Sequence, residues 1–103
     1  MKASPKKQLN NLIQGKPYLV IGIEADSFRI IDETGEPYLY DPSTFDIIDP
    51  KEPDFWESEI GDDGERYSYP KEWIRPGFFE DYFDNEPLAK KTFIEVLNRK
   101  YAP

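Results

Sequence analysis

Carboxylates are the side chains most able to do chemistry in this sequence, because its 103 residues include 21 Asp and Glu but no His and no Cys. Without Cys the chain cannot form a disulfide, a thiolate nucleophile or a Cys-ligated zinc site. Without His it lacks the usual general base and the Ser-His-Asp arrangement. The chemistries left are carboxylate pairs, acid–base work by Lys or Tyr, and Mg²⁺ or Ca²⁺ held by oxygen ligands.

The turn Gly61-Asp62-Asp63-Gly64-Glu65 is the densest candidate for a cation site. A calcium-binding EF-hand loop needs acidic residues at its first, third and fifth positions and a Glu at its twelfth. With Gly64 at the sixth position, the third position falls on Gly61 and the twelfth on Pro70, so the pattern fails. The sequence therefore favours a polar hairpin turn, and it predicts no cofactor and no metal site.

A pair of carboxylates suited to glycoside hydrolysis is the other catalytic candidate. With so many acidic residues, some pair will lie at any chosen separation, so the composition singles out no catalytic pair. A solvated acidic face explains the same residues. We keep a small carboxylate enzyme or a divalent-cation-binding protein as an alternative function.

Charge is unevenly spread along the chain. Residues 1–16 hold four Lys and no acid, residues 17–70 hold 15 acids and three bases, and residues 88–103 hold four bases and one acid. The acidic middle would repel phosphates and anionic lipid and would attract a basic partner. Nucleic-acid binding through the Lys-rich termini is a further alternative, but the acidic middle disfavours it.

Acidic residues also alternate with aromatic rings, in segments 38–41, 55–59 and 79–84. Rings beside carboxylates suit a surface that docks a Lys- or Arg-rich protein, since the rings supply anchors and the acids steer encounter. Most of these rings must also serve the core of a chain that is 38% hydrophobic and 16% aromatic. The sequence thus favours a non-enzymatic protein–protein interaction module. The steering residues would be Glu57, Glu59, Asp62, Asp63, Glu80 and Asp81, with Trp56 and Tyr82 as anchors.

Short apolar runs predict strands at 18–23, 27–31, 37–40 and 45–48, with a 3₁₀ turn over 41–44. Tight turns joining four short strands, with one helical turn before the last, are typical of a small SH3-like barrel, here over residues 15–49. A proline-rich connector then leads to a β-hairpin over 54–69.

The two ends of the chain are expected to differ. Residues 1–14 read as an N-terminal arm or short helix, and residues 77–101 as a helical tail whose amphipathic helix packs on the strands. The predicted fold is one mainly β domain with a C-terminal helix (α+β), spanning 1–103. The expected core comprises Val20, Ile21, Ile23, Phe28, Ile30, Leu39, Phe45, Trp56, Phe93 and Leu97.

Three parts of the chain carry a resemblance: residues 15–23, the segment 28–40 with its "D-E-T-G-E" turn and "Y-L-Y" strand, and Phe45. Together they resemble small uncharacterised bacterial proteins with an SH3-like barrel. The resemblance implies that fold but no activity and no catalytic residue. By analogy, some small acidic proteins of this kind act as immunity, antitoxin or regulatory partners. The chain has no apolar run long enough for a membrane span, and its basic start lacks the apolar region of a secretory signal. A cytoplasmic protein is therefore expected, with its oligomeric state open.

Overall fold

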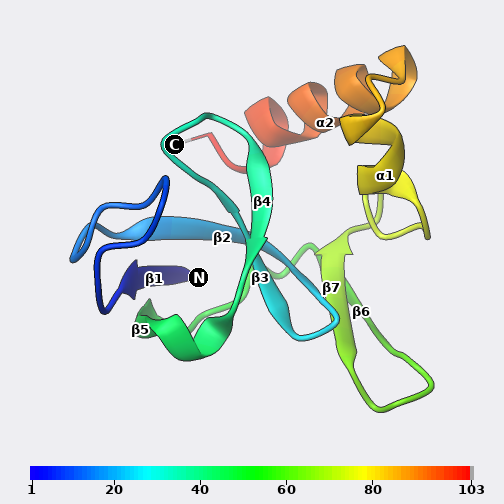
Figure 1. The fold of residues 1–103 in the computed structure, drawn as a ribbon. Coiled ribbons are helices and arrows are strands. Elements are labelled where there is room, and N and C mark those ends of the chain that lie inside the picture. The colour runs from blue at the N-terminus through cyan, green and yellow to red at the C-terminus, as the bar shows by residue number, and fades with distance from the viewer. Residues whose placement is uncertain (103) are drawn as a thin grey trace.

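The computed structural model describes residues 1–102, and Figure 1 shows its two helices gathered on one side of the strands. The strands are β1 (Lys2–Pro5), β2 (Tyr18–Glu24), β3 (Ser27–Ile31), β4 (Pro37–Tyr40), β5 (Phe45–Asp49), β6 (Trp56–Ile60) and β7 (Arg66–Pro70). A 3₁₀ turn at Pro42–Thr44 precedes β5, and helices α1 (Phe78–Phe83) and α2 (Pro87–Lys100) follow β7. The predicted α+β class, mainly β with a C-terminal helix, is confirmed.

The sheet is antiparallel, and five of its strands lie in the order β4-β3-β2-β1-β5. β7 pairs with β2 through Ser68 and Ile23, and β6 pairs with β7 along its whole length. The predicted hairpin is thus present, and it projects away from β1 and β5 (Figure 1). β1 fills the space between β2 and β5, so the first strand of the chain joins two later ones.

The prediction of an arm or short helix over residues 1–14 is wrong, because the chain begins with β1. Ala3 is fully buried between β2 and β5. Within this segment, Leu9 and Leu12 form a bridge that closes a turn. Backbone hydrogen bonding explains the difference: a strand here pairs with β2 and β5 at once, whereas a helix would leave the facing N–H and C=O groups of both without partners.

A register shift in β2 between Val20 and Gly22 divides the side chains of this strand between two apolar clusters. Val20 and Ile23 join one cluster and Ile21 the other, because the shift changes which face the later residues reach. The sheet cluster comprises Ala3, Leu12, Tyr18, Val20, Ile23, Phe28, Ile30 and Phe45. The helix-side cluster comprises Ile21, Tyr69, Trp73, Phe78, Phe79, Tyr82, Ala89, Phe93 and Val96.

Helix α2 is fixed at both ends. The Glu86 side chain accepts hydrogen bonds from two N–H groups of the first turn, and Pro87 occupies the first helical position. In the last turn Arg99 and Lys100 pair with Glu72 at 2.5 and 3.1 Å. No helix within residues 1–102 has the length and apolar composition that crossing a membrane requires.

The core agrees with most of the predicted residues. Seven are buried: Val20, Ile21, Ile23, Phe28, Ile30, Phe45 and Phe93. Trp56 and Leu97 are half-buried, and Leu39 is 39% exposed because β4 is an edge strand. Trp73, which the sequence analysis did not include, is 1% exposed and is the largest fully buried side chain. Its ring stacks 4.8 Å from that of Phe93.

Phe93→Ala is expected to lower the free energy of unfolding by about 3–5 kcal/mol, because the ring is buried among Trp73, Phe79 and Tyr82. Urea denaturation followed by tryptophan fluorescence would measure the change. A loss below about 1 kcal/mol would show that α2 is not docked on the rest of the chain. A single transition would also agree with the predicted one-domain organisation.

Gly22→Ala is expected to destabilise the fold by about 1–3 kcal/mol, because a Cβ there would lie 2.0 Å from Cε1 of Tyr69. Gly61→Ala is the matched control. Its Cβ would meet only the carboxylate end of the flexible Glu65 side chain, which can move aside. Equal melting temperatures for the two variants would contradict the close packing of Tyr69 on β2.

Candidate functional site

A cleft of about 700 Å³ lies between β7, β3 with its edge neighbour β4, and helix α1. Its volume is within the range of small-ligand and side-chain binding sites. Most of its lining side chains are apolar or aromatic, and five are charged. The lining comprises Glu24, Arg29, Leu39, Tyr67, Tyr69, Trp73, Ile74, Arg75, Pro76, Gly77, Phe78, Phe79, Glu80, Phe83 and Asp84.

A smaller hollow of about 230 Å³ adjoins the cleft on the hairpin side. Glu59 and Ile60 of β6 line it, together with Tyr67, Ile74 and Pro76, which also line the cleft. We call the cleft and this hollow together the acidic groove. It extends from the hairpin to α1.

The buried guanidinium of Arg29, 4% exposed, forms part of the cleft wall. Its Nε donates to the Tyr69 hydroxyl at 2.9 Å, and its Nη2 donates to Glu24 at 2.7 Å. Its Nη1 donates to the Pro37 carbonyl at 2.8 Å, and its central carbon lies 4.0 Å from the ring centroid of Phe79. A charge this deeply buried is tolerated only when it is paired and hydrogen-bonded, as it is here.

The alternation of β3 places Arg29 at this site. Phe28 and Ile30 share the sheet cluster, as the sequence predicted, so Arg29 between them points to the opposite face. That face would meet solvent in an isolated sheet, but α1 covers it through Phe79. The strand pattern thus fixes the direction of the side chain, and the helix buries it.

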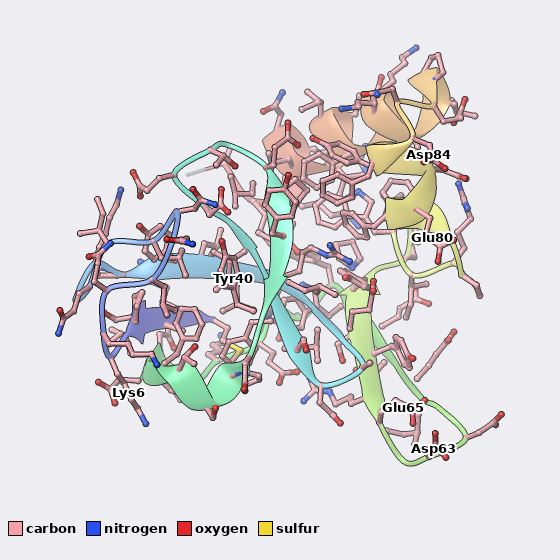
Figure 2. The ribbon with its side chains drawn as sticks, viewed as in Figure 1. Lys6, Tyr40, Asp63, Glu65, Glu80 and Asp84 are labelled. Carbon is pink, nitrogen blue, oxygen red and sulfur yellow. The ribbon has the colours of Figure 1, made fainter. Side chains whose placement is uncertain are left out.

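Acidic residues dominate the mouth of the cleft. The two arginines of the lining already have partners, Arg29 as described and Arg75 with Asp81 at 2.9 Å. Glu80 and Asp84 are exposed and make no ion pair with any residue in 1–102. Figure 2 shows Glu80 on α1 and Asp84 directly after the end of this helix. Of the predicted α1 acids, Glu80 therefore remains available to a partner, whereas Asp81 is engaged within the protein.

The predicted acids Glu57, Glu59, Asp62 and Asp63 all lie exposed on the hairpin. Only Glu59 lines the acidic groove. The hairpin tip is a polar turn, as predicted, and the Glu65 carboxylate accepts a 2.9 Å bond from the N–H of Asp63. Figure 2 shows these two residues at the tip, apart from α1. The structure therefore brings one hairpin acid, not four, to the groove that Glu80 lines.

The two predicted anchors are structural in this fold. Tyr82 is 5% exposed, its ring lies 4.9 Å from that of Phe93, and its hydroxyl donates to Glu36 at 2.8 Å. Trp56 is half-buried, and its Nε1–H donates to the Tyr101 hydroxyl at 2.8 Å. Neither lines the groove. An amphipathic pattern cannot separate a ring that faces solvent from one covered by a second helix.

The buried tyrosines act as hydrogen-bonding groups. Burial, with the bond to Glu36, raises the pKa of Tyr82 to about 12. Burial also raises the pKa of Tyr69, against the opposing effect of the nearby Arg29. Both hydroxyls therefore stay protonated at neutral pH. Within residues 1–102, no group of three or more acidic side chains converges in a way that would hold a metal ion.

The predicted steering and anchor residues omit several residues of the groove, among them Glu24 and Arg29, and also Phe83 and Asp84 of the ring-and-acid segment 79–84. Asp84 could have been predicted, because it follows Glu80 by four residues and so shares its helical face. Arg29 carried a weaker signal, a lone cation inside an apolar strand. Glu24 gave none, because a carboxylate at a strand end is usually solvated.

No protein-family model, curated protein or solved structure matches the chain. What the protein does is therefore inferred from the geometry and charge of the groove.

Tyr69→Phe is expected to destabilise the protein by about 1–3 kcal/mol, because it leaves Arg29 Nε without its acceptor in a buried site. Tyr67→Phe is the matched control, being the same change two residues away on β7 at a half-buried position. Thermal and urea denaturation of both variants would measure the difference. Equal losses would contradict a structural role for the Arg29 hydrogen bonds.

Proposed function

We propose that the protein is a non-enzymatic interaction module that binds a basic protein partner, in an immunity-like, antitoxin-like or regulatory role. The acidic groove is the observation that carries this proposal. Glu59 lies at its hairpin end and Glu80 and Asp84 at its helix end, with apolar and aromatic side chains between. This arrangement combines anchors that lose water on binding with acids that steer a cationic surface.

Exposed apolar side chains in the groove support docking. Ile60 is 68% exposed, and Leu39 and Phe83 are 39% and 38% exposed. Single exposed apolar residues are ordinary, but several along one groove edged by charges are typical of an interaction surface. A partner would cover these side chains and gain from removing them from water.

The position of the protein's own lysines also favours a protein partner. Lys6, in the turn after β1, lies on the far side of the molecule from Glu80 and Asp84 in Figure 2. Lys6 therefore does not neutralise the groove. A basic protein would meet uncompensated carboxylates there, whereas a phosphate backbone would be repelled.

We also propose that β1–β5 form an SH3-like barrel. The 3₁₀ turn at Pro42–Thr44 lies directly before β5, and β5, the end strand of the order β4-β3-β2-β1-β5, pairs with β1. The pairing of the first strand with the fifth supports closure of the meander.

The proposal predicts that an arginine-rich peptide binds at low ionic strength and that its affinity falls at least about tenfold between about 0.05 and 0.5 M salt, because exposed charges are screened. Fluorescence anisotropy of a labelled peptide would measure both affinities. Equal binding at the two ionic strengths, or no binding at the lower one, would overturn the proposal.

Two double variants that remove equal charge show whether peptide binding depends on the groove or on net charge alone. Glu59→Gln with Glu80→Gln removes two groove acids, and Asp46→Asn with Glu95→Gln removes two acids on β5 and α2 that do not line the groove. The first pair is expected to weaken binding several-fold more than the second. Equal losses would show that net charge alone attracts the peptide, which contradicts a specific groove.

A further inference from the structure

Rings of helix α1 already contact two guanidinium groups of the protein itself, and each guanidinium also pairs with a carboxylate, from β2 in one case and from α1 in the other. Arg29 lies 4.0 Å from the ring centroid of Phe79 and pairs with Glu24. Arg75 lies 5.3 Å from that of Phe78 and pairs with Asp81. Cation–ring contact and a charged hydrogen bond together are the recognised means of holding a guanidinium.

A third set of the same groups lies at the mouth of the cleft without a cation. Phe83 and Asp84 are adjacent, and Glu80 precedes Asp84 by one helical turn; all three line the cleft. Neither carboxylate has an ion-pair partner in residues 1–102, as described above. Tyr38 stacks on Phe83 with centroids 5.2 Å apart and fixes that ring, while 38% of Phe83 stays exposed.

One residue of the cleft lining carries an unsatisfied donor. Trp73, which lines it, is 1% exposed, and its Nε1–H is the one buried side-chain polar atom without a hydrogen-bond partner in the described residues. An isolated cation could not accept from it, whereas a peptide supplies carbonyl oxygens. Buried donors are normally paired, so an unpaired donor on a lining residue supports a ligand that brings an acceptor.

We propose that this mouth, formed by Glu80, Phe83 and Asp84, binds an arginine side chain of a peptide segment in the partner, with the adjoining cleft accepting the peptide backbone. This rests on the proposed function and specifies its ligand. Arginine suits the site better than lysine, because a planar guanidinium can stack on Phe83 while its N–H groups reach carboxylates on one side. The cleft, at about 700 Å³, has room for the side chain together with neighbouring backbone.

The test uses the full chain, labelled with ¹⁵N, and three acetylated, amidated peptides that differ only at the central residue: arginine, citrulline or lysine. Citrulline keeps the shape of arginine and removes its charge. The arginine peptide is expected to shift the backbone amides of Glu80, Phe83 and Asp84 saturably, and the indole N–H of Trp73 downfield. The indole signal of Trp56, already bonded to Tyr101, should not move. The citrulline peptide is expected to bind at least about tenfold more weakly than the arginine peptide, and the lysine peptide several-fold more weakly.

Two variants locate the site. Glu80→Gln with Asp84→Asn is expected to abolish the shifts, whereas Glu57→Gln with Asp62→Asn, which removes the same charge from hairpin acids outside the groove, should leave most of the affinity. Both pairs change exposed side chains, and the unperturbed amide spectrum of each variant shows whether it has folded. Should either fail to fold, the citrulline comparison on the wild-type chain gives the answer alone.

The possible results separate this inference from the function on which it rests. Four results would overturn the arginine site while leaving a basic-partner module in place. These are shifts confined to the hairpin, unchanged peptide binding by the Glu80/Asp84 variant, an indole signal of Trp73 that does not shift, and a lysine peptide that binds as tightly as the arginine peptide. No binding of any basic peptide at low salt would overturn both.

Discussion

The buried guanidinium of Arg29 is the interaction on which the arrangement of sheet and helices depends. It lies on the face of β3 that α1 covers, and it contacts four separate parts of the chain: the end of β2, the start of β4, β7 and α1. A guanidinium can make the three hydrogen bonds in one plane because its donors are fixed in a fork, while the central carbon lies over the ring of Phe79. Apolar packing is not directional, whereas the hydrogen bond to Tyr69 and the ring contact with Phe79 hold these two residues in defined positions.

The charge pattern of the groove follows from the same contacts. Since Glu24 pairs with Arg29 and Asp81 with Arg75, two of the acids near the cleft are used internally. The acids left free are those at the mouth, Glu80 and Asp84, together with those of the hairpin. A chain with a net charge of −8 thus presents some of its uncompensated carboxylates beside exposed apolar side chains, which is the basis for proposing a basic partner.

Local patterns in the sequence were sufficient for most of the strands and for both helices. Alternation in β3, Pro37 at the start of β4, and Glu86 with Pro87 at the start of α2 each act through near neighbours, so they could be recognised without a fold. β1 could not be recognised in this way, because its strand conformation depends on pairing with β2 and with β5, which is far along the chain.

The candidate site was predictable only in part, for the same physical reason. Exposed acids such as Glu59 and Glu80 needed no tertiary information. The burial of Tyr82 depends on α2 covering it, and the burial of Trp73 depends on Phe93 and Tyr101, which stack against it. The pairing of Arg29 with Glu24 needs β2 and β3 to be adjacent and α1 to lie over them.

A double-mutant cycle between Arg29 and Phe79 tests most directly whether this arginine joins the sheet to the helices. The single variants would be Arg29→Met and Phe79→Leu, with their combination, and urea denaturation would give the free energy of unfolding of each. The account predicts a coupling free energy of about 0.5–3 kcal/mol, because the two side chains are in direct contact across the layers. Additive losses, to within about 0.3 kcal/mol, would contradict it.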